Sequence, residues 1–165
     1  LHEEEKLRNA ELQRDNYEKE VEIKKNELTS HALHMVHKNE LLQNLKDQIS
    51  KFEEKSNNEE LKSYRQLKFM INGSAQTDKE WENFNRHFEN VHQGFLFRLK
   101  NEYPVLTSND LRLSAMMKLN LSSKEVAAIM NISPESVKKA RYRLRKKLEL
   151  PEEADLHSFM MNLEN

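Results

Sequence analysis

The chain of 165 residues contains no cysteine, two glycines and three prolines. The lack of cysteine excludes a disulfide scaffold, a cysteine-ligated zinc site and a thiol nucleophile, and it fits a reducing compartment. Two glycines and three prolines are too few to punctuate the turns of a β-sandwich or a β-barrel. The longest apolar run, Val126 to Met130, is far too short to span a membrane, and no signal peptide is visible. An all-α fold is therefore predicted.

The near-neutral total charge conceals an uneven distribution along the chain. The sequence has 27 lysines and arginines against 28 aspartates and glutamates, a formal net charge of -1. Residues 107–150 nevertheless carry ten bases and four acids, whereas residues 151–165 carry four acids and no lysine or arginine. Seven of the ten bases lie between Lys138 and Lys147. Such a block is either a solvated helix face or a surface that binds phosphates.

Residues 1–54 are predicted to form one long helix, because they contain no glycine or proline and are rich in good helix formers. Apolar residues recur at seven-residue intervals, the pattern of a coiled coil. A helix this polar needs a buried apolar face, so we expect it to pair, most simply with a second copy of the chain. A helical hairpin within one chain is the alternative. The expected dimerisation residues are Val21, Leu28, Met35, Leu42, Leu45, Ile49 and Phe52.

Two further helices are expected before residue 104. The first runs from Glu59 to Ile71 and ends at Asn72-Gly73-Ser74. The second starts at the T-x-x-E capping box of Thr77 and ends at Tyr103-Pro104. It carries an aromatic stripe, for which core packing is favoured over a platform that stacks bases. The stripe consists of Trp81, Phe84, Phe88, Val91, Phe95 and Leu99.

Polar capping residues divide the rest of the chain into four short helices. The second of these is about two turns long and ends near Met130, and Asn131-Ile132 forms a tight turn. The third begins with Pro134 and continues to about Leu148. Asn120 is expected to end the first helix in a left-handed conformation. The predicted caps are Thr107 or Ser108, then Ser122, Ser133 and Asp155.

A two-turn helix, a tight turn and a longer basic helix form a helix-turn-helix pattern, whose last helix enters the major groove of DNA. Its inward face should hold Val137, Ala140, Leu144 and Leu148. The residues expected to read bases are Lys138, Lys139 and Tyr142. The residues expected to contact phosphates are Arg141, Arg143, Arg145 and Lys147 at the edges of the helix, with the hydroxyls of Ser122, Ser133 and Ser136. Lys146 is expected on the outer face, beside the base-reading residues.

Residues 104–164 also resemble a known family. The segments Leu106-Thr107, Leu121 to Ala127, Ile132 to Lys138 and Arg145 to Leu148 are similar to the LuxR/GerE-type DNA-binding domain in order and spacing. The family pattern runs roughly L-T, S-x-K-E-I-A, I-S-x-x-T-V-K and a basic K-L ending. The resemblance implies that the third helix of the domain lies in the major groove of DNA, with Lys138, Lys139 and Tyr142 at the positions that contact bases.

The sequence departs from the LuxR/GerE pattern at two places. Asn120 stands where the family often has glycine, and Asn109-Asp110 stands where it often has an R-E pair. The region-four domain of sigma factors is related and has the same shape, so promoter reading of the sigma type is an alternative.

The whole chain more loosely resembles the cytoplasmic tail of bacterial membrane-bound sensory regulators. Those proteins have an extracytoplasmic sensor, one membrane span, a coiled-coil helix and a LuxR-type domain. The block from Trp81 to His92, with Tyr103-Pro104 and Leu106-Thr107, carries this resemblance. It implies that a membrane span precedes Leu1.

Other function classes are less well supported by the sequence. His31, His34 and His37 on the long helix suggest a phosphotransfer and dimerisation module of a sensor kinase, but no glycine-rich ATP-binding segment follows. The same histidines rotate around the helix without a carboxylate among them, which disfavours a metal site. A pure coiled-coil scaffold would explain residues 1–54 but not the capped basic segment. No phosphate-binding, zinc-protease or serine-hydrolase motif occurs, so no enzyme is predicted.

The sequence therefore predicts a cytoplasmic, dimeric, sequence-specific transcription regulator. Its predicted parts are a coiled-coil helix at residues 1–55, a helical linker at 56–103 and a helix-turn-helix domain at 104–165. The predicted partners are double-stranded DNA, a second copy of the chain and RNA polymerase. No cofactor, metal ion, catalytic residue or small-molecule substrate is expected.

Overall fold

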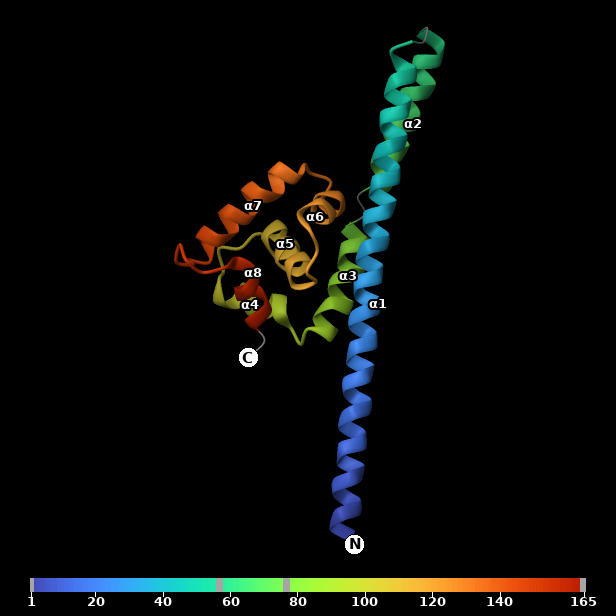
Figure 1. The fold of residues 1–165 in the computed structure, drawn as a ribbon. Helices are drawn as coiled ribbons and strands as arrows, with labels where there is room; N and C mark the ends of the chain where they lie inside the picture. Colours follow the sequence, from blue (N-terminus) through green and yellow to red (C-terminus); the bar gives the residue numbers. More distant parts are fainter. Residues whose placement is uncertain (1, 56–57, 76–77, 164–165) are drawn as a thin grey trace.

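The computed structural model describes residues 2–55, 58–75 and 78–163. These residues form eight helices and no strand, so the predicted all-α class is confirmed. Figure 1 shows one long rod, α1 (His2–Glu53), with a smaller group of helices beside its middle. The 52 residues of α1 correspond to a length of about 78 Å. Residues 2–27 project beyond the other helices, and nearly all of their side chains are exposed.

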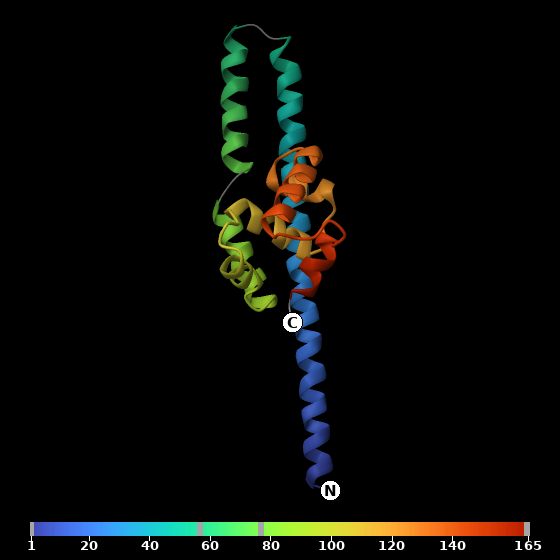
Figure 2. The ribbon, with the colours of Figure 1, turned by 90° about the vertical axis from the view of Figure 1, so that its left-hand side faces the viewer.

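The second helix, α2 (Asn58–Ala75), runs back along the C-terminal part of α1, as Figures 1 and 2 show from two sides. Phe52 stacks on Tyr64 with ring centroids 6.2 Å apart, and Glu53 forms an ion pair with Lys68. This part of α1 therefore forms a helical hairpin within one chain. The prediction that the second helix ends at Asn72 is wrong, because packing against α1 offsets the small helical cost of a single glycine.

The aromatic stripe is divided between two helices, α3 (Asp78–Val91) and α4 (Phe95–Glu102), so the prediction of one continuous helix is wrong. The predicted cap at Thr77 lies outside the described residues. The stripe does pack in the core, since Phe84, Phe88, Phe95 and Leu99 are fully buried.

The break between α3 and α4 has a local cause. Gln93 and Gly94 have φ angles of 51° and 75°, in the left-handed region that glycine enters without steric cost. The N–H of Gly94 donates to the carbonyl of Glu89 at 3.0 Å, which closes α3. The Glu89 carboxylate then accepts from the N–H groups of Leu96, at 2.7 Å, and Phe97, at 3.3 Å. One side chain of α3 thus caps the start of α4.

Four helices complete the fold: α5 (Ser108–Lys118), α6 (Ser123–Met130), α7 (Pro134–Lys147) and α8 (Leu156–Asn162). All four begin at predicted caps, because the side chains of Thr107, Ser122, Ser133 and Asp155 each accept a hydrogen bond from the backbone N–H three residues later. Left-handed residues follow the first three helices: Asn120, Asn131 and Glu149, with φ between 53° and 59°.

A single core joins the rod to the C-terminal helices. Leu28, Ala32 and Met35 on α1 belong to the same cluster of buried side chains as the aromatic residues of α3 and the inward residues of α5, α6 and α7. The rod packs on α2, α3 and α6. Within the described ranges, no helix is both long enough and apolar enough to cross a membrane.

The bend at Gly94 makes a testable prediction. Gly94→Ala should lower the free energy of unfolding by about 1–2 kcal/mol, because an L-residue pays that cost in the left-handed region. Chemical denaturation followed by circular dichroism measures the change. Gly73→Ala is the matched control, because Gly73 lies inside α2 with open space around its Cα; it should be neutral or stabilising. Equal effects of the two substitutions would contradict this account of the bend.

Candidate nucleic-acid interface

The inward face of α7 attaches this helix to α5 and α6. Val137, Leu144 and Leu148 are buried, and Ala140 is half-buried. These are the four residues that the sequence placed on the inward face. Because they fall at intervals of three and four residues, the opposite side of α7 must face solvent.

The solvent side of α7 carries the residues predicted to read bases. Lys138 and Lys139 are exposed, and Tyr142 is 60% exposed. Lys146 lies on the same side, with its Nζ 4.7 Å from the centre of the Tyr142 ring. Lys138 approaches Glu135 at 3.8 Å, but both side chains are about 70% exposed, so this ion pair holds the lysine only weakly. The structure thus brings three lysines and one tyrosine together on a surface open to a partner.

The predicted phosphate contacts differ in their surroundings. Arg143 is exposed at one edge of α7, and Arg141 is half-buried at the other. Arg145 instead donates to the carbonyls of Pro151, Glu152 and Ala154, at 2.6 Å for Glu152. Its guanidinium therefore holds the loop between α7 and α8, a role that the sequence did not indicate.

The three predicted serines all lie at helix starts. The Ser122 and Ser133 hydroxyls already accept capping hydrogen bonds from Glu125 and Ser136, and the Ser136 hydroxyl lies 2.9 Å from that of Ser133. Their side chains are therefore committed to the caps. The N–H groups of Ser123 and Lys124 in α6 and of Glu135 in α7 still point outward along the helix axes, whereas Pro134 at the start of α7 has no N–H.

Two further bases counted in the basic segment, besides Arg145, have internal roles. Lys118 is only 7% exposed, and its Nζ donates to the carbonyls of Met160 and Met161 at 3.0 and 2.9 Å. It also lies 5.2 Å from the centre of the Phe95 ring. Lys118 thus anchors the C-terminal helix α8 to α5 and adds nothing to the basic surface.

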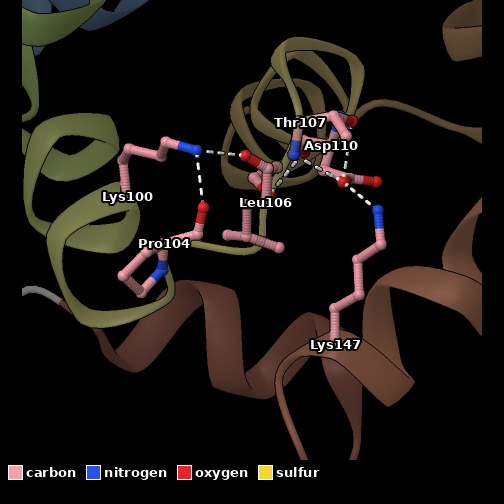
Figure 3. A network of polar contacts seen from close by, with 7 residues as sticks. Lys100, Pro104, Leu106, Thr107, Asp110 and Lys147 are labelled. Atoms are coloured by element: carbon pink, nitrogen blue, oxygen red, sulfur yellow. Dashed lines mark hydrogen bonds and ion pairs between the residues drawn. The ribbon is translucent and has the colours of Figure 1, made fainter.

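The second internal base is Lys147, which Figure 3 shows pointing from the end of α7 to Asp110 near the start of α5. The Lys147 Nζ lies 2.6 Å from the Asp110 carboxylate. The same carboxylate accepts from the N–H and the hydroxyl of Thr107, both at 2.8 Å. Nearby, Lys100 donates to the carbonyls of Pro104 and Leu106, which closes the loop between α4 and α5.

The Asp110 contacts stabilise its ionised form. Burial alone would raise the pKa of this carboxyl, but the hydrogen bonds from Lys147 and Thr107 act against burial and together lower the pKa below its usual value. The carboxylate is only 12% exposed, so solvent screens this cluster little. Asp110 is one of the positions at which the sequence departs from the LuxR/GerE pattern, yet it links α5 to α7.

The long helix also reaches α6, the helix that precedes α7. Asn39 on α1 donates from its amide nitrogen to the carbonyls of Ala128, at 2.9 Å, and Ile129, at 3.3 Å, in the last turn of α6. A pocket of about 560 Å³ lies between α1, α3, α5 and α7, and Trp81, Arg112 and Arg143 are among its lining residues. The rod therefore lies directly beside the segment that leads into α7.

The predicted dimerisation residues separate into two groups. Leu28 and Met35 are buried inside the chain, and Val21, Leu42 and Ile49 are half-buried. Leu45 and Phe52 are 44% and 57% exposed. The heptad pattern thus describes a surface that is used largely within the chain itself.

The histidines of α1 are dispersed. His31, His34 and His37 are exposed; His31 lies edge-on to Phe84, and His37 is 3.9 Å from Glu40. Across the described ranges, no group of three or more histidine, aspartate or glutamate side chains is placed to hold a metal ion.

Comparison of the chain with family models, with curated proteins and with solved structures gave no match.

The Asp110 cluster makes a testable prediction. Because the pKa of Asp110 is lowered by folding, its contribution to stability is present above the unfolded pKa and is lost as the pH falls through the folded value. Asp110→Asn should lower the free energy of unfolding by about 1–2 kcal/mol at pH 7, and the difference should shrink as the pH falls through the lowered pKa of Asp110.

Urea denaturation of both proteins between pH 7 and pH 2 measures this effect. Asp15→Asn is the control, because the Asp15 side chain is 56% exposed on α1 and should have little effect at any pH. A difference between wild type and Asp110→Asn that stays constant over the whole pH range would contradict the proposed ionisation.

Proposed function

We propose that residues 104–163 form a LuxR-type helix-turn-helix domain that binds double-stranded DNA through α7. The observation that carries this proposal is the exposed side of α7, where three lysines and Tyr142 gather opposite a buried apolar face. An α-helix fits the major groove of B-DNA, and lysine side chains reach both base edges and phosphates there.

Two features of the surroundings support the proposal. The arrangement of a short capped helix, a tight left-handed turn and a longer helix is that of a helix-turn-helix. The outward N–H groups at the start of α6 and α7 offer phosphate donors without any side chain. The sequence resemblance to the LuxR/GerE-type domain agrees with this arrangement.

The long helix supplies the signal in this proposal. Asn39 holds the last turn of α6, so a displacement of α1 acts on the turn that positions α7. Two chains joined through their helical arms would present two copies of α7 to two half-sites, about 34 Å apart if they lie one turn apart on the DNA. The work of such a regulator is in the cytoplasm, with RNA polymerase as its further partner.

The first experiment selects bound sites from random double-stranded DNA with the full chain. A DNA-binding protein should return one enriched sequence, and a regulator that binds as a pair should return that sequence as a repeat. Its affinity should fall steeply with salt, because each phosphate contact releases counterions. Recovery of unenriched DNA at all salt concentrations would refute the proposal.

The selected site then tests the role of α7. Lys138→Ala and Lys139→Ala should each weaken binding to that site by about 5–150-fold, because a specific base contact is worth about 1–3 kcal/mol. Fluorescence anisotropy with labelled DNA measures the affinity. The helical content should not change, because both side chains are exposed.

Lys62→Ala is the matched control, because Lys62 is an exposed lysine on α2, far along the hairpin from α7. It should leave the affinity within about twofold of wild type. If both α7 variants bind the selected site as tightly as wild type, the assignment of these lysines as readers is refuted.

A further inference from the structure

The long helix has two apolar faces, and only one of them is buried in the core of the chain. The first face holds Leu28, Ala32 and Met35, which are buried in the common core. A substitution such as Leu28→Asp would disturb folding, so it could not report on pairing of two chains. Ala32 is nine residues from both Ile23 and Leu41, about two and a half helical turns. Those two residues must lie on the opposite side of α1.

The second face is a stripe that runs along most of α1. Its successive members are separated by eleven, eighteen, four and seven residues, which are about three, five, one and two turns. All are large, apolar and between 44% and 60% exposed: Leu12, Ile23, Leu41, Leu45 and Phe52. Most of the large exposed apolar residues of α1 lie on this stripe. The many other surface positions of α1 are mainly occupied by polar residues.

The stripe widens where α2 lies beside it. Phe52 stacks on Tyr64 with an angle of 18° between the rings, which places Tyr64 at the edge of the stripe. Leu67 and Met70 follow Tyr64 at three-residue intervals, and each interval turns about 60° around α2, so this row of residues leads from the contact with α1 outward. They are 46% and 62% exposed. Together the two helices present a broad apolar surface on the side of the hairpin away from the buried face of α1.

The part of this surface between Leu41 and Phe52 is free of charge, which favours contact with a second copy of the chain. Between Leu41 and Phe52 the other exposed position on the stripe is Gln48, which is uncharged. A twofold interface places each residue near its own copy, so like charges at its centre would repel. An apolar and uncharged centre meets this condition.

The surface is also large enough for a stable dimer interface. Seven side chains that each expose on the order of 100 Å² would remove about 1,400 Å² of accessible surface from the two chains together, which is the size of a stable interface. A parallel pair aligns the widest parts of the two surfaces, whereas an antiparallel pair would set them against the narrow, more polar stretch before Ile23.

We infer that a second copy of this chain packs in parallel on the stripe formed by Leu12, Ile23, Leu41, Leu45 and Phe52 of α1, widened by Leu67 and Met70 of α2. The inference deepens the pairing of chains in the proposed function. The dimer surface is then not the heptad seam that includes Leu28 and Met35. The helix-turn-helix domains lie away from the contact and remain open to DNA.

The first test measures mass without DNA, so its failure is distinct from a failure of DNA binding. Wild type should sediment as a dimer, and the Leu45→Glu/Phe52→Glu variant should raise the dimer dissociation constant at least about 100-fold. The control is Phe69→Glu, because Phe69 is 78% exposed on the same hairpin but is turned about 160° around α2 from Leu67. It should leave the dimer intact.

The second test uses the lack of cysteine in the chain. A Leu45→Cys variant should form a disulfide-linked dimer on mild oxidation, because a parallel pair brings the two copies of residue 45 together, whereas Phe69→Cys should remain unlinked. A monomeric wild type, a dimer that survives the double substitution, equal effects at Phe69, or no cross-link at residue 45 would each overturn the inference.

Discussion

The carboxylate of Asp110 joins the start of α5 to the end of α7, and the direction in which α7 presents its basic side depends on that contact. One oxygen accepts from Thr107 and from Lys147, so the cap of one helix and the position of another share a single group. Burial makes the ionised carboxylate costly, and only the full set of donors offsets the cost. The inward apolar residues hold α7 against the core, but apolar contacts have no direction, whereas this contact does.

The elements that depend on neighbouring residues could be predicted from the sequence. Caps such as Ser122 and Ser133 act over three residues, and the inward face of α7 follows from helical spacing, so both were found. Contacts between distant residues were not. Asn39 is 89 residues from Ala128, and Lys118 is 42 from Met160, and no local pattern marks such pairs. The turn at Gly94 was also missed, because the aromatic spacing of the stripe continues across it and Glu89 caps α4 only after the chain has turned.

The heptad pattern of α1 had two explanations that a sequence alone does not separate. Any long helix with recurring apolar residues can bury them against its own chain or against another copy. The structure shows that much of this apolar face of α1 packs against α2, α3 and α6. The apolar residues of α1 that stay exposed are therefore the ones that indicate a partner. Charge behaves in the same way: Lys118, Arg145 and Lys147 add to the basic total, yet each is tied to an internal group. What remains exposed on α7 is a smaller and more selective set.

The continuity of α1 has a mechanical consequence. From His2 to Glu53 the helix contains no glycine and no proline, the residues at which helices most readily bend. A turn applied at one end is then not absorbed along the way and arrives at Asn39, about 55 Å further on, as a rotation of the same sense. In these terms α1 transmits torsion, and the contact of Asn39 with the last turn of α6 receives it. A small angular movement at its N-terminal end would reach the residues beside α7 without any change in the length of α1.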